Sequence, residues 1–263
     1  MDALAAKRLL HKVDLMIVKR AFSGLLVLLG TTAFARTVTP THVPSLKSVV
    51  ARMASASAEN RGRLRPYKVI RTYKLYGSER EKVKSEVNAD ITFIPPDMER
   101  YVIRKAKGLA LGAVIVRKML ESETEILSDE QANDISEANY AFHFVREETF
   151  HDRPCYVLKL DPLRKDMKLL RGMAWVDAAT FLIHRIEGEP AKPPSWWVRD
   201  VHITLDFHDV GGMWLQDALL STARVRFLGQ HTISSRDGDY EYKMSASDSD
   251  EPHVFRTKVP KSD

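Results

Sequence analysis

The stretch Gly108-Leu-Ala-Leu-Gly-Ala-Val-Ile-Val-Arg-Lys-Met-Leu-Glu-Ser-Glu-Thr-Glu125 begins apolar and lies between segments that alternate apolar and polar residues. The uncharged run from Leu109 to Val116 is too short for a bilayer, which requires about 20 residues. We therefore expect a helix that buries itself in protein, within a chain otherwise built of strands. An apolar helix beside a long sheet is more typical of a protein that encloses a ligand than of an enzyme.

Apolar residues recur at every second position before this stretch. Tyr67 to Leu75 and Lys82 to Phe93 both alternate, which is typical of half-buried antiparallel strands. Pro95-Pro96-Asp97 indicates a turn, and Met98 to Lys107 predicts a third strand that ends at the glycine opening the helix. Three meander strands are therefore expected ahead of the helix.

Further strands are expected after a polar stretch, Ser128 to Asn139, which predicts a loop. His151-Asp152-Arg153-Pro154 indicates a hairpin connection between the first two of them. The alternating segments in this half of the chain lie at about 140–144, 155–160, 172–176, 181–186, 197–210, 214–220, 222–229 and 239–243. The whole chain then holds a continuous run of about ten strands.

Only one other helix is expected, capped by Ser45 and running to about Asn60. Two helices are too few to cover the apolar face of about ten twisted strands, and a sheet of that size tends to curl or close. The sequence therefore predicts an α+β fold, mainly β with helices. Its curved antiparallel sheet should form an open half-barrel, plugged by one or two helices, in one domain over residues 36–243. The hollow that remains is the candidate binding site.

The first 35 residues predict an export signal. Lys19 and Arg20 precede the apolar run Ala21 to Leu29, and Ala33-Phe34-Ala35 is an A-x-A cleavage site. We expect cleavage after Ala35, a periplasmic location and a true start at Met16. The alternative, an uncleaved anchor, is disfavoured because the run is short and ends in small residues. Residues 244–263 are polar and predict a flexible tail.

Charge and cysteine content exclude some classes of protein. The formal net charge is +5, and the leader holds five Lys or Arg against two Asp, so the remainder carries only +2. This balance gives no support to nucleic-acid binding, which requires clustered basic residues. Cys155 is the only cysteine, so no internal disulfide is possible and the fold must rest on its core. We expect a monomer.

Residues able to carry catalysis are not grouped in the sequence. His202 and His208 share a strand face but lie about 20 Å apart along an extended chain, so they cannot chelate one ion together. His151 and Cys155 lie close across a turn and could form a base and nucleophile, but a hairpin-tip histidine and a buried thiol are the simpler interpretation. We expect no catalytic residue, metal or cofactor.

Several segments resemble the exported outer-membrane lipoprotein-sorting-like proteins: Asn139–Phe144, Arg153–Asp166, Gly172–Asp177, Ile186–Trp197 and Val210–Leu215. The resemblance spans about Tyr67 to Tyr242 and implies a half-barrel with helices plugging its concave side. Carriers of this superfamily hold lipoprotein acyl chains during transit across the periplasm, and other members regulate stress signalling or bind other lipids. The resemblance also implies an inner-strand arginine that locks the lid helices. Arg71 and Arg104 are the candidates.

These observations favour a soluble periplasmic protein that carries a lipid or lipoprotein acyl chain without covalent chemistry. The alternative is an envelope-stress sensor that uses the same fold to bind an inner- or outer-membrane protein. An enzyme is the least favoured class. We predict that the apolar cavity has a gate on one row of the apolar helix, formed by Leu111, Ile115 and Met119. Its wall is predicted to be Val69, Ile91, Tyr101, Phe142, Leu158 and Trp175.

Overall fold

The computed structural model describes residues 44–78, 82–108, 110–194, 196, 198–227, 229–242 and 253–255. The predicted signal segment therefore lies outside the described residues. In chain order the elements are α1 (Leu46–Arg63), β1 (Tyr67–Tyr76), β2 (Val83–Ile94), β3 (Met98–Gly108), α2 (Ala110–Ser128), α3 (Glu130–Asn133), β4 (Tyr140–Phe150), β5 (Arg153–Pro162), β6 (Leu170–Asp177), β7 (Ile183–Pro190), β8 (Val198–Val210), β9 (Met213–Val225), β10 (Gly229–Tyr242) and β11 (His253–Phe255).

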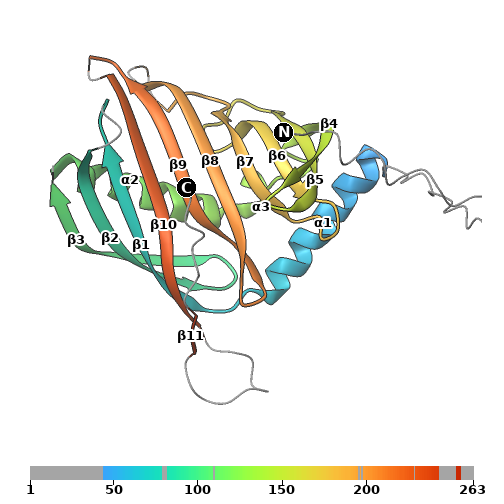
Figure 1. Ribbon diagram of the computed structural model, residues 1–263, viewed down its shortest axis with the longest axis horizontal. Helices are drawn as coiled ribbons and strands as arrows, with labels where there is room; N and C mark the ends of the chain where they lie inside the picture. The colour runs from blue at the N-terminus through green and yellow to red at the C-terminus, as the bar shows by residue number, and fades with distance from the viewer. Residues whose placement is uncertain are drawn as a thin grey trace, which may run out of the picture. The chain divides into compact units, whose positions relative to one another are not determined.

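A single curled antiparallel sheet dominates the fold (Figure 1). Its strand order is β3-β2-β1-β10-β9-β8-β7-β6-β5-β4, with the short β11 paired to β10. Two meanders, β1 to β3 and β4 to β10, are joined where the first and last long strands pair, for example at Tyr73 and Ser235. The sheet is open, with β3 and β4 at its two edges. The predicted α+β class with a curved sheet of about ten strands is confirmed.

Helix α2 is part of the connection between the two edges of the sheet. It follows edge strand β3 and, through α3, leads to the opposite edge strand β4, so it crosses one face of the sheet (Figure 1). Gly108 permits the entry turn, because its φ is +87° and a Cβ would lie 2.1 Å from the Lys84 carbonyl oxygen. Val116 and Leu120 then bury against the first meander.

Helix α1 covers the second meander. The Ser45 hydroxyl accepts a hydrogen bond from the Ser48 backbone N–H at 3.2 Å, which caps the helix as predicted. Val49, Val50 and Met53 are buried, and they pack with residues of β4 to β7 such as Leu158 and Ala174. The two helices thus lie over separate apolar clusters on the same side of the sheet, hereafter the helix-covered face. None of the helices in the described ranges is long and apolar enough to cross a membrane.

Two connections differ from the sequence prediction or add to it. The stretch Ser128 to Asn139, predicted as a loop, contains the short helix α3. Within the predicted tail, β11 pairs with Tyr240–Tyr242 of β10, and the rest of that tail lies outside the described residues. The predicted hairpin after β4 is a two-residue turn in which His151 and Asp152 have φ of 48° and 60°, as the right-handed twist of a tight hairpin requires.

Candidate functional site

The structure divides the predicted gate and wall residues among different clusters. Val69 and Ile91 are buried under α2, with Tyr101 and Met119 packed against them. Phe142 and Leu158 belong to the cluster under α1. Ile115 is half-buried on α2. The side chain of Leu111 lies outside the described part.

Trp175 lies on the opposite face of the sheet from Phe142 and Leu158. Successive residues of a strand point to opposite faces, and its neighbour Ala174 belongs to the cluster under α1. Trp175 instead packs with Cys155 and Val157, and its indole N–H donates to Glu148 Oε1 at 2.6 Å. It therefore cannot share an inner wall with the other predicted residues.

A cavity of about 290 Å³ lies between α1, the segment around α3 and the helix-covered face of the sheet. This volume is close to the lower end of the range for ligand pockets, about 300 to 1,000 Å³. Its apolar lining comes from both helices and from the sheet: Met53, Ala54, Ile126, Ile135, Phe181, Leu182, Ile183, Ile186, Phe207 and Trp214. None of the eight predicted site residues with described side chains is among the lining residues.

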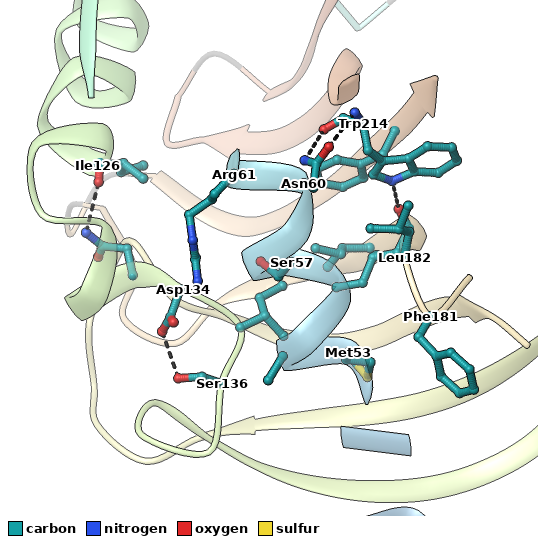
Figure 2. A pocket seen from close by; sticks show the side chains of 16 residues that line it. Met53, Ser57, Asn60, Arg61, Ile126, Asp134, Ser136, Phe181, Leu182 and Trp214 are labelled. Atoms are coloured by element: carbon teal, nitrogen blue, oxygen red, sulfur yellow. Dashed lines mark hydrogen bonds between the residues drawn. The ribbon is translucent and has the colours of Figure 1, made fainter. Parts of the chain in front are cut away.

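The cavity has an apolar and a polar side. Figure 2 shows Phe181, Leu182 and Trp214 on one side, and Arg61 and Asp134 on the other. The polar members of the lining are Ser57, Asn60, Arg61, Asn133, Asp134 and Ser136. A molecule with an apolar body and a polar end matches this arrangement, since each part meets groups of its own kind.

Hydrogen bonds hold the aromatic wall of the cavity in place. Asn60 Nδ2 donates to the Trp214 carbonyl at 2.9 Å, and the Trp214 backbone N–H donates to Asn60 Oδ1 at 2.7 Å (Figure 2). The indole N–H of Trp214 donates to the Ile183 carbonyl at 2.7 Å. This wall is therefore preformed, and α1 is attached to β9 at the same point.

A buried charge cluster lies under α2. Arg71 Nε donates to Asp237 Oδ1 at 2.5 Å, and Arg71 Nη1 donates to Glu123 Oε2 at 2.6 Å. Tyr240 adds a hydrogen bond to Asp237 at 2.5 Å. Arg71 thus links β1, β10 and α2. Arg104, the other candidate, is on the surface and pairs with Asp90.

The cluster holds more acid than base. Three carboxyl groups, Asp237, Glu123 and Glu99, surround the single guanidinium of Arg71. Burial raises the pKa of Glu99 to about 7; Arg71 opposes this shift, and the charges of Glu123 and Asp237 add to it. Burial also raises the pKa of Glu123, against the opposing effect of Arg71. The pKa values of both Glu99 and Glu123 are therefore raised above the ordinary range of a carboxyl group, that of Glu99 to about 7.

The residues considered for nucleophilic chemistry have structural surroundings. Burial raises the pKa of the Cys155 thiol to about 11, which suppresses the reactive thiolate. His151 stacks edge-on against Phe150, with ring centroids 4.2 Å apart. Asp177 closes a turn. Burial pushes its pKa up, but hydrogen bonds from Thr180, His184, Ala179 and Arg153 outweigh this and lower it to about 2.

Comparison with known proteins yields likenesses of structure only. No protein-family model and no curated protein matches the sequence. A domain from Vibrio parahaemolyticus assigned to outer membrane lipoprotein sorting matches with a TM-score of 0.42 at 12% identity, over 73% of this chain and 92% of its own. A DUF1329 family protein from Desulfovibrio piger matches with a TM-score of 0.41 at 13% identity, over 78% and 97%. A LolA superfamily protein from Nitrosomonas europaea matches with a TM-score of 0.38 at 10% identity, over 77% and 96%.

These matches include proteins of the superfamily that the sequence resembles. Identities of 10 to 13% leave the function of this chain to be argued from its own residues. Two signals in the sequence do lead toward the site. Arg71 falls in the buried phase of β1 between Val69 and Tyr73, and Trp214 lies two residues after the Gly211-Gly212 turn, where its backbone is hydrogen-bonded to Asn60 of α1.

Proposed function

We propose that this chain is an exported, non-covalent carrier of an acyl chain or similar lipid tail, held between α1 and the helix-covered face. The observation that carries the proposal is the preformed cavity, with apolar side chains on the sheet and polar side chains on α1 and on the segment around α3. A lipid tail would lie against Phe181, Ile186 and Phe207. Its polar end would face Arg61 and Asp134.

The expected affinity follows from burial of the tail. Each methylene removed from water contributes about 0.8 kcal/mol, so six of them contribute about 5 kcal/mol before the cost of association is subtracted. A volume of about 290 Å³ accepts a short segment of an acyl chain. A longer chain requires α1 or the segment around α3 to move aside, because these elements form the cavity wall opposite the sheet.

Two substitutions on α1 test the site. Ser57 and Ser55 are both exposed on α1, but Ser57 lines the cavity and Ser55 is not among the lining residues. Ser57→Phe fills the space that the tail would occupy, and we expect it to weaken binding of a dansyl-labelled undecanoic acid by about tenfold or more, equivalent to about 1.4 kcal/mol. Ser55→Phe, the matched control, should bind like the wild type. Equal binding by both variants, with unchanged circular dichroism, would refute the site.

The ligand class requires a separate experiment. Native mass spectrometry and lipid extraction of the protein recovered from the periplasm should give an acyl lipid at near one-to-one occupancy. The Ser57→Phe variant should carry less of it. Recovery of the protein from the cytoplasm, or of empty protein from the periplasm, would contradict the carrier proposal even if the cavity binds the dansyl probe.

One observation favours the alternative of an interaction module. In the described part of the chain, strand β9 pairs with β10 only as far as Ala218 and Arg236. Past Arg236, β11 takes the place beside β10 and pairs with Tyr240–Tyr242. The edge of β10 thus accepts an added antiparallel strand, which is a common mode of peptide recognition. A variant ending at Tyr242 that captures a periplasmic segment of a membrane protein, while the full chain does not, would support this alternative.

A further inference from the structure

The tip of the β9–β10 hairpin carries an exposed cluster of two aromatic rings and an arginine. Trp196, which precedes β8, is 72% exposed, and Phe227, in the hairpin turn, is 91% exposed. The Arg226 guanidinium lies between them, 5.5 Å from the Trp196 ring centroid and 5.3 Å from that of Phe227. This cluster lies at the opposite end of β9 from the Gly211-Gly212 turn (Figure 1).

The backbone at Phe227 is unfavourable for its side chain. Its φ is +68°, in the left-handed region that glycine or asparagine adopts more readily than a bulky residue. The ring is almost fully exposed, so packing against the core does not compensate for the conformation. The hairpin turn accounts for the backbone conformation, as it does at His151 and Asp152, but it does not account for an exposed phenyl ring at this position. Strained positions of this kind cluster at functional sites.

Positive charges predominate among the described residues of the two segments that carry the cluster, 196–200 and 224–230. Arg199 of β8 lies directly opposite Arg224 of β9 in the sheet register, an arrangement that is unfavourable for like charges. Arg226 adds a third guanidinium. The opposing charge among the described residues of this end, 196–200 and 224–230, is Asp200, which lies 3.4 Å from Arg224. An anionic partner relieves the excess.

We propose that this end of the sheet docks on the surface of an anionic phospholipid bilayer. Indole and phenyl rings partition into the headgroup region, and arginines in the same plane pair with phosphate groups. Each arginine near such a surface strengthens binding by about fivefold. Two rings and three arginines therefore support reversible attachment. This inference goes beyond carriage of a ligand, and it is independent of the cavity.

The experiment is flotation of the full chain with vesicles. Wild-type protein should float with vesicles of phosphatidylethanolamine and phosphatidylglycerol, and at least tenfold less with phosphatidylcholine alone. Phe227→Gly combined with Trp196→Ser should abolish flotation. Because glycine suits a φ of +68°, the variant is expected to fold as well as the wild type. The matched control, Leu163→Ser with Met167→Ser, removes two exposed apolar residues in the β5–β6 connection and should float normally.

Fluorescence locates the contact. Brominated acyl chains should quench wild-type emission more than that of a Trp196→Phe variant, because Trp196 is the exposed indole among the described residues of the proposed surface. Failure of the wild type to float with anionic vesicles would overturn the proposal, as would flotation that survives loss of both rings. A self-association lost in the same double variant, without flotation, would reassign the cluster to contact between copies of the chain and equally overturn it.

Discussion

Glu99→Gln isolates the electrostatic cost of the charge cluster under α2. Burial raises the pKa of Glu99 from 4.5 to about 7 in the folded protein. Between these pH values the folded state binds more protons than the unfolded state, so stability falls as pH rises. The loss is complete above about pH 7 and amounts to at most about 3 kcal/mol. Glutamine has nearly the same shape and never ionises, so it does not incur this loss.

The expected result is a pH-dependent difference in stability between variant and wild type. Below pH 4.5 the two should unfold at similar urea concentrations, because Glu99 is then neutral in both states. At pH 8 the variant should be more stable by up to about 3 kcal/mol, which shifts the urea midpoint by about 1 M for a slope of about 3 kcal/mol/M. Tryptophan fluorescence in urea at several pH values measures both quantities.

A matched control measures how far neutralising an exposed carboxylate changes stability by itself. Glu137 is exposed and lies outside the cluster, so Glu137→Gln should track the wild type at every pH. Two results would refute the reasoning. A stability difference that stays constant from pH 4 to 8 would mean that Glu99 is not protonated by its surroundings. A Glu99→Gln variant that is weaker at pH 8 would mean that Arg71 depends on the ionised carboxylate.

Three further substitutions test other parts of the structure. Arg71→Met leaves Asp237 and Glu123 buried without their cation and should cost about 3 to 5 kcal/mol in urea unfolding, whereas a cost under about 1 kcal/mol would contradict the role of the cluster. Asp177→Ala should lower the free energy of unfolding by about 2 kcal/mol near neutral pH and by little at pH 2. The folded state lowers the pKa of Asp177 from 3.8 to about 2, and the stabilisation that this provides is lost as pH falls through that interval. An equal cost at pH 2 would disprove this reasoning. Gly108→Ala should lower the melting temperature, because φ is +87° and the Lys84 carbonyl blocks a Cβ at this position. Gly62→Ala should raise it, because Gly62 lies on α1 with open space around it and alanine favours a helix. Equal shifts for the two variants would contradict the argument.

Local patterns predicted most elements of the fold. The segments 214–220 and 222–229, predicted as two strands, instead form the single strand β9, and only the end of β10, about 239–243, was predicted. The alternation over Lys82 to Phe93 corresponds to β2, where Val87, Ala89, Ile91 and Phe93 are buried. The predicted cap at Ser45 and the buried row Val49, Val50 and Met53 are those of α1. Each of these features depends on residues within a few positions, which is why periodicity and capping rules capture them.

The site could not be predicted in the same way, because it depends on how the sheet curls. The cavity brings Ser57 of α1 near Phe207 of β8 and Trp214 of β9, residues about 150 positions later in the chain. Strand periodicity assigns each residue to a face, but not to a place along that face. Trp175 shows the limit of reasoning by aromaticity alone. Its strand was correctly predicted, but the indole packs on the face opposite the helices.

The two helices that cover the sheet differ in how they are attached, and α1 supplies more of the cavity lining than α2, which contributes Ile126. Helix α2 enters through Gly108, buries Val116 and Leu120, and is tied to the sheet by the Arg71–Glu123 ion pair. It also belongs to the connection between the two edge strands, so displacing it would disturb both edges of the sheet. Helix α1 has its polar attachment near its C-terminal end, at Asn60, and the cavity lies directly beneath Ala54 and Ser57. The helix that is conspicuous in the sequence thus contributes Val116 and Leu120 to the core, and movement of the amphipathic helix before it would enlarge the hollow.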